Sequence, residues 1–466
     1  MIFNYKNAVL LFVTDNRTPL LLALAILFVV LSLAENFDSF QLFNYPLRRF
    51  LQLSAILVST LFIFYHASKS GKIAIHFLRE DILLLLITLI SLWGLLNSGL
   101  WCMNNSFNCH NNSFIINRFL HWTGGIWVIF VTYYLAQSLD FCVLDNLVRL
   151  VVFIVAGITL IYLIDYSLVR QDIDLITRNN VGTSGGEIIN RFYYYGYHRL
   201  IGGFREPSHA GAYLLIIYSM TFGFRSLWVK SIIACALFLT GSIIVYGALF
   251  VLLLYQMLIS FLRKDKRILA LSALGIVCGL VLANILSFEY SPEFTDPASH
   301  NFGYSEYRYE LIVKSLKHRH ILCNSFENAD KYLLCMLGGI PGRGYVFLHA
   351  IQEPLTAFGN GLIEPYFNLQ KFLQVGIIPS FLSSFMAFLQ QFGIIGLTFI
   401  VGLNILIILR LTIISIKKIS YAKYSSGLVS ICLMCACLIE EPSYFMMMFL
   451  GICLGLLRAE ALVRVR

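Results

Sequence analysis

The sequence is poor in charge. Only 13% of its 466 residues are charged and 58% are hydrophobic, and the mean hydropathy is +0.77. Soluble domains need far more polar surface, so this composition excludes a chain built from them. The sequence also lacks the basic patch of a soluble nucleic-acid module, and we expect no nucleic-acid binding.

The motifs of nucleotide and metal sites are missing as well. The stretch 338–345 is rich in glycine but matches neither a Walker nor a dinucleotide-binding pattern. The cysteines outside the expected spans and inner loops are Cys102, Cys109, Cys323 and Cys335. No pair among them has the tight spacing of a zinc knuckle, and only Cys109 stands beside a histidine, His110. We therefore expect neither a metal nor an organic cofactor.

Long apolar runs are what the chain does contain. They predict a single integral membrane domain over 1–466, all-α and polytopic, with about twelve transmembrane helices. The runs are 18–34, 50–66, 82–100, 119–137, 149–167, 209–224, 231–242, 244–262, 268–287, 392–410, 426–438 and 443–457. The shortest of them are 231–242 and 426–438.

Basic residues predict the orientation of these spans. Short cytoplasmic loops retain Lys and Arg, and if every run crosses, the basic clusters such as 263–267 and 417–423 fall on one side. Both termini are then cytoplasmic, and the net charge of +9 follows from this bias. Two large loops, 168–208 and 288–391, are expected on the outer face.

Four of the eleven cysteines, Cys102, Cys109, Cys323 and Cys335, fall on the expected outer side. Disulfides are favoured there over zinc. Local closure would pair Cys102 with Cys109 and Cys323 with Cys335, although four cysteines allow three pairings.

Arginine is dense in the two outer loops. A guanidinium grips two oxygens at once, which suits phosphate or pyrophosphate. The alternative is that these side chains reach lipid headgroups or pair with loop acids. The arginines of interest are Arg191, Arg199, Arg205, Arg308 and Arg343.

The segment 199–211 holds the most informative group. Arg205 and Glu206 precede Pro207, which is favoured at the first position of a helix, and His209 follows one turn into the expected helix. A carboxylate or imidazole there can accept a proton from a hydroxyl. A plain helix start and a hydrogen-bonded histidine are the alternative explanation.

These motifs together resemble the Wzy-type O-antigen polymerase family, within the O-antigen polymerase and ligase superfamily. The resemblance covers roughly 190–410 and rests on the following segments: Arg205-Glu-Pro-Ser-His-Ala-Gly211, Leu239-Thr-Gly-Ser-Ile-Ile-Val-Tyr-Gly-Ala-Leu249, Arg308, Gly342-Arg-Gly344 and Phe392-Gly-Ile-Ile-Gly-Leu397. Ligases usually carry a His-Asn type motif before the last segment, whereas 375–384 has none. His349 is a candidate for a displaced ligase histidine.

The resemblance implies a GT-C-like glycosyltransferase in the bacterial inner membrane, with its active site facing the periplasm. Its substrate would be an oligosaccharide linked to undecaprenyl pyrophosphate, and a chain-length regulator in the same membrane is a possible partner. Arg205, with Arg191, Arg199, Arg308 and Arg343, would bind pyrophosphate. Glu206 or His209 would orient or deprotonate the acceptor hydroxyl.

Two other functions fit the same pattern. An O-antigen ligase would transfer the finished glycan to lipid A core. A flippase for the lipid-linked oligosaccharide would need charges within its spans, lining a central cavity. The apolar runs are almost free of charge, which favours an enzyme over a transporter.

Overall fold

The structure is a computed structural model that describes residues 18–37, 40–42, 45–70, 79–104, 113–139, 141–169, 200–204, 207–287, 356–362, 384–439 and 442–465. This part of the chain is helical apart from turns and the short hairpin β1 (Gln41–Leu42) and β2 (Tyr45–Pro46), which pair antiparallel. Its helices are α2 (Thr18–Ala34), α3 (Leu47–Ser70), α4 (Arg79–Asn104), α6 (Ser113–Ser138), α7 (Phe141–Val169), α9 (Pro207–Met220), α10 (Leu227–Leu239), α11 (Ile243–Arg263), α12 (Lys266–Leu286), α17 (Ser384–Lys417), α18 (Ala422–Cys437) and α19 (Tyr444–Val465), with 3-10 turns η1 (Glu35–Phe37) and η5 (Ile419–Tyr421).

Each of the twelve predicted runs overlaps one of the twelve helices in the described ranges. Nine of these helices are long and apolar enough to cross a membrane, which confirms a polytopic membrane protein. The others are α9, α10 and α18, with 14, 13 and 16 residues. At 1.5 Å per residue they are shorter than a hydrocarbon core of about 30 Å, so twelve crossings stay a prediction.

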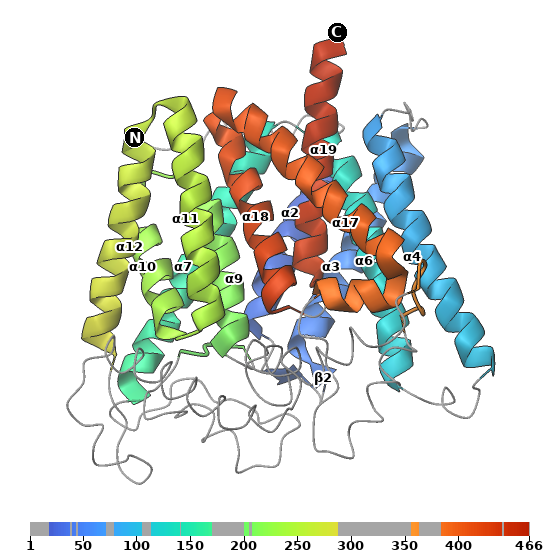
Figure 1. The fold of residues 1–466 in the computed structure, drawn as a ribbon, viewed down its shortest axis with the longest axis horizontal. Helices are drawn as coiled ribbons and strands as arrows, with labels where there is room; N and C mark the ends of the chain where they lie inside the picture. Colours follow the sequence, from blue (N-terminus) through green and yellow to red (C-terminus); the bar gives the residue numbers. More distant parts are fainter. Residues whose placement is uncertain are drawn as a thin grey trace, which may run out of the picture.

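The helices stand side by side, and α17 runs diagonally across its neighbours (Figure 1). The ends of α7 and α12 and the start of α9 lie at the lower edge of the view, which we call the loop side. The turn between α11 and α12 and the C-terminal end of α19 lie at the upper edge, which we call the basic side. Lys264 and Arg263 belong to that turn, and Arg458 lies near the end of α19.

Small residues let α6 and α19 pack closely. A Cβ added to Gly451 would lie 2.5 Å from the Ile129 carbonyl oxygen, and one added to Gly455 would lie 2.6 Å from the Tyr133 oxygen. Thr132 also donates a hydrogen bond across the pair to the Met448 carbonyl, at 3.2 Å. Close backbone approach at small residues, together with hydrogen bonds between helices, is how helices associate in a bilayer.

Ionic contacts hold helix ends together on the basic side. Lys423 of α18 forms a buried ion pair with Asp145 of α7. Lys418 pairs with Glu460 at 2.9 Å. Arg263 Nη1 donates to the carbonyl oxygens of Ser415 and Ile416, at 2.8 and 2.9 Å, where a cation also complements the C-terminal dipole of α17.

Helix α17 is broken at Gly393, whose φ of 70° and ψ of −172° are not helical. The segment 356–362 supplies the missing backbone partners. Asn360 N donates to Gln390 O at 2.9 Å, and Ile395 N donates to Ala357 O at 3.1 Å. The sequence predicted a span from 392, but α17 begins at Ser384, so its first turns lie within the predicted outer loop 288–391.

The predicted disulfides are only partly described. Cys102, at the end of α4, is disulfide-bonded, as expected for a cysteine on the outer side. Its proposed partner Cys109, and the pair Cys323 and Cys335, lie outside the described residues.

Candidate functional site

Of the seven predicted site residues, only His209 lies in the described part of the chain. Arg205 and Glu206 fall between two described segments, 200–204 and 207–287. Arg191, Arg199, Arg308 and Arg343 also lie outside the described residues. The site is therefore built here from the elements that flank Arg205 and Glu206 in the sequence.

The turn 200–204 leads into Arg205 and is buried along its whole length. Leu200 N donates to the Leu239 carbonyl at the end of α10, at 2.9 Å, and Phe204 N donates to Ile201 O at 3.2 Å. Phe204 also packs its ring against Tyr213 of α9, with ring centroids 5.4 Å apart. The chain before Arg205 is thus fixed to the bundle.

Two glycines allow the turn to fit there. Gly202 has φ of 59°, a left-handed conformation that glycine adopts without steric cost, and a Cβ on it would lie 2.5 Å from the Tyr162 ring. A Cβ on Gly203 would clash with the backbone oxygen of Asn36. The backbone of the turn therefore lies directly against α7 and η1.

Hydrogen bonds connect four elements behind this turn: α2, η1, α7 and α9. Tyr162 of α7 donates to Asn36 O at 3.0 Å. The Asn36 side chain donates to the Tyr213 hydroxyl at 3.2 Å, and Tyr213 donates in turn to Ser32 O at 2.7 Å. Because buried polar groups are costly without partners, these bonds fix η1, α7 and α9 relative to each other.

An ion pair extends the network to α3. Arg48 lies 2.9 Å from Glu35, and Gln52 donates to the same carboxylate at 3.4 Å. Glu35 is buried, while about a quarter of the Arg48 side chain is exposed. Asp165, also buried, lies one turn beyond Tyr162 on α7. Charged groups from α3 and α7 thus stand near the loop-side ends of their helices.

His209 lies in the first turn of α9 and is exposed. Tyr213, four residues later on the same helix face, is buried in the network described above. Gly211 sits between them in the sequence, and a Cβ on it would lie 2.8 Å from Thr240 Oγ1 and 3.0 Å from Val245. The start of α9 is therefore packed against α10 and α11, with the His209 side chain at the surface.

We call this assembly the α9 cradle: the turn 200–204, η1 and the adjoining parts of α2, α3, α7 and α9. Its residues lie on the loop side, and in the sequence they flank the short stretch that carries Arg205, Glu206 and His209. Within the described ranges, no group of three or more His, Cys, Asp or Glu side chains is arranged to hold a metal ion.

Sequence reasoning missed the supporting residues of the cradle. Asn36 and Tyr213 are 177 residues apart, and no local motif marks them as partners. Glu35 was the one cradle residue that the sequence could have indicated, because it is an acid directly after the apolar run 18–34.

Comparison with protein-family models, curated proteins and solved structures finds no match for the chain.

Proposed function

We propose that this protein is an O-antigen polymerase, a membrane glycosyltransferase of the GT-C-like type. It joins oligosaccharide repeat units carried on undecaprenyl pyrophosphate at the periplasmic face of the bacterial inner membrane. In this proposal all twelve helices cross the membrane, the loop side faces the periplasm and the basic side faces the cytoplasm.

The α9 cradle is the observation that carries the proposal. Phe204 is buried against Tyr213, and Pro207 begins α9, so only Arg205 and Glu206 connect two fixed elements. Catalysis by charge stabilisation requires groups that are held in place before the reaction. An ordinary helix start does not require a buried turn with two sterically required glycines. This turn therefore supports a role in positioning the residues that follow it.

The chemistry needs little beyond this positioning. Undecaprenyl pyrophosphate is a good leaving group, so the donor already contains an activated glycosidic bond. As that bond breaks, negative charge grows on the pyrophosphate, and Arg205 would stabilise it with a bidentate pair of hydrogen bonds, aided by Arg191, Arg199, Arg308 and Arg343. Glu206 or His209 would orient the attacking hydroxyl and accept its proton.

The distribution of buried charge supports an enzyme over a flippase. The buried acids Asp145 and Asp165 stand near opposite ends of α7, and the buried Lys423 stands in the first turn of α18. A transporter would instead concentrate charge around a cavity at the middle of the membrane.

Deleting the gene and examining surface lipopolysaccharide tests the proposal. A polymerase deletion leaves lipid A core capped with a single repeat unit, and a plasmid copy restores the ladder of longer chains. Complete loss of attached glycan would instead indicate a ligase or a flippase.

A further inference from the structure

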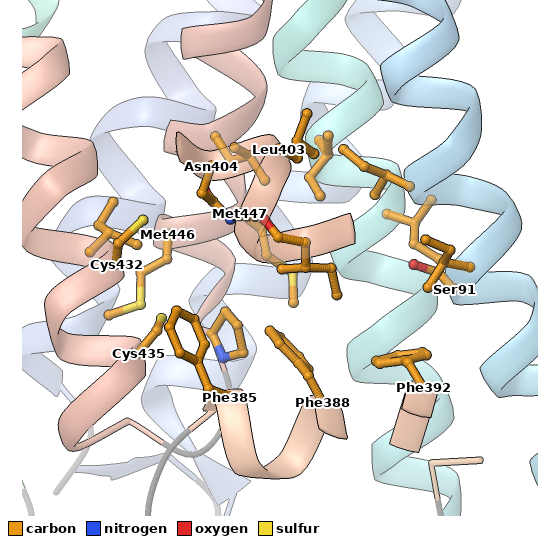
Figure 2. Close-up of a pocket in the computed structure, with 18 of the residues that line it drawn as sticks. Ser91, Phe385, Phe388, Phe392, Leu403, Asn404, Cys432, Cys435, Met446 and Met447 are labelled. Carbon is orange, nitrogen blue, oxygen red and sulfur yellow. Dashed lines mark hydrogen bonds between the residues drawn. The ribbon is translucent and has the colours of Figure 1, made fainter. Parts of the chain in front are cut away.

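An apolar pocket lies between α4, α6, α17, α18 and α19, and we call it the five-helix pocket. It has an accessible volume of about 110 Å³ and is partly open. Phe385, Phe388 and Phe392 line one edge, and Leu403 and Asn404 lie at the opposite edge (Figure 2). This volume is somewhat smaller than that of an engineered apolar cavity of about 150 Å³ that binds benzene, so the size of the pocket suits a short hydrocarbon segment.

The pocket adjoins the α9 cradle through a single helix. Tyr213 of the cradle packs against Phe445 of α19, with ring centroids 5.8 Å apart. The next two residues of α19, Met446 and Met447, line the pocket. Pro442, just before α19, lines it too. The first turn of α19 therefore forms a wall shared by the cradle and the pocket.

One buried polar group lies in the pocket wall beside Phe388 and Phe392. The indole N–H of Trp122 is buried without a hydrogen-bond partner in the described part of the chain, in a wall of the pocket. The neighbouring His121 hydrogen-bonds to the Pro442 carbonyl at 3.0 Å, which places this turn of α6 beside the start of α19. A buried donor without a partner calls for an acceptor, and a ligand with a polar end here and an apolar chain beyond it would supply one.

We propose that the five-helix pocket binds the part of the isoprenoid chain nearest the pyrophosphate of a lipid-linked oligosaccharide. This inference rests on the proposed function. A substrate held at the α9 cradle must have its chain within reach of the cradle, and the pocket is an apolar recess that meets this condition. Pockets of this kind bind apolar ligand parts through area and fix them with a few polar groups.

The pocket can be tested by photolabelling of the whole purified protein in detergent. The first probe is a polyprenyl diphosphate with a diazirine on the isoprene unit nearest the diphosphate, and the second is phosphatidylglycerol with a diazirine on an acyl chain. Mass spectrometry then identifies the labelled peptides. We expect the prenyl probe to label the peptides that contain Cys432, Met446 and Met447. Excess unlabelled undecaprenyl diphosphate should remove this labelling, and excess phosphatidylglycerol should not.

Two variants fill the pocket from opposite walls, Ser91→Phe on α4 and Cys432→Phe on α18. Both should lose labelling by the prenyl probe. The matched control is Leu92→Phe, because Leu92 is the next residue on α4 and 45% of its surface is exposed, outside the pocket. Leu92→Phe should label like the wild type. Thermal melting establishes that each variant is folded.

Persistent labelling in both folded, filled variants would overturn the proposal. So would equal labelling of these peptides by phosphatidylglycerol, or its equal competition on the wild-type protein, because the pocket would then be an acyl-chain site. Labelling does not depend on polymerisation. A normal lipopolysaccharide ladder in the deletion strain would overturn the proposal that the protein is a polymerase, and it would leave the labelling result standing. Single-repeat capping together with failed labelling would overturn only the proposal that the pocket binds the isoprenoid chain.

Discussion

Gly203 is the residue at which the chain entering the proposed site has least room. A Cβ added to Gly203 would overlap the backbone carbonyl oxygen of Asn36, which cannot move aside as a flexible side chain can. The adjacent Gly202 combines a left-handed backbone with contact to the Tyr162 ring. These two residues set the path by which the chain reaches Arg205.

Gly203→Ala should therefore displace the turn 200–204. Overpacking of this kind costs about 1–3 kcal/mol, so we expect a lower melting temperature in detergent together with short or absent polymer. Gly157→Ala on α7 is the control, because a Cβ there has no neighbour within 4 Å. If Gly203→Ala kept wild-type melting and polymer length, the turn would have no positioning role.

Arg205 tests the chemistry proposed at the cradle. A compact ammonium cannot reproduce the planar fork of a guanidinium, so Arg205→Lys should fail nearly as badly as Arg205→Ala. Loss of such a transition-state contact is worth roughly 3–4 kcal/mol, on the order of a few hundred-fold in rate. Polymer length is compared in membranes that contain equal amounts of each protein.

Arg225→Lys serves as the control for this pair. Arg225 is an exposed arginine in the turn between α9 and α10, at the other end of α9 from the cradle. It should give a normal ladder. A near-normal ladder from Arg205→Lys would mean that Arg205 only anchors the start of its helix.

Helix α17 shows at the level of an element how the membrane protein tolerates a broken helix. Gly393 adopts a conformation that is essentially restricted to glycine. The segment 356–362 then bonds to the backbone groups that the break releases. Irregular backbone at membrane depth is tolerated only with such internal partners. Just before the break, Phe392 packs on Trp122, with centroids 5.3 Å apart, in the wall of the five-helix pocket.

Gly393→Ala should be strongly destabilising. The unfavourable backbone conformation costs about 1–3 kcal/mol, and the new Cβ would clash with the Ala357 carbonyl. Gly402→Ala, on the same helix with no neighbour within 4 Å of an added Cβ, should melt like the wild type or slightly higher. Equal melting temperatures for the two variants would show that the break is not required.

At the scale of the whole molecule, the proposed reaction requires one orientation of the helix bundle in the membrane. The basic residues of the turn between α11 and α12 predict that this turn is cytoplasmic, and the two long loops are then periplasmic. Reporter fusions at residue 265 and residue 330 should give opposite sides. Activity of the same reporter at both positions would contradict the orientation and would leave α9 and the cradle on the wrong face for the proposed reaction.

Hydropathy located the helices because a span must satisfy its backbone internally and present apolar side chains to lipid, and both requirements are local. Hydropathy predicted a span that starts at 392, eight residues after the true start of α17 at Ser384. The turns before Gly393 are stabilised by a tertiary contact from 356–362, which hydropathy does not detect. Hydropathy could not identify the contacts of the α9 cradle for the same reason, because they are tertiary. Asn36 hydrogen-bonds to Tyr213, which is 177 positions away in the sequence. The candidate residues Arg205, Glu206 and His209 came from a local motif, and their support came only from the fold.

We propose that this chain alone links lipid-borne repeat units. The most direct measurement uses purified protein in liposomes, supplied with undecaprenyl-pyrophosphate-linked repeat units and no lipid A core or nucleotide. We expect lipid-linked oligomers that grow by whole repeat units, and none with Arg205→Ala. If oligomers never formed, and glycan moved only when lipid A core was added, the protein would be a ligase and not a polymerase.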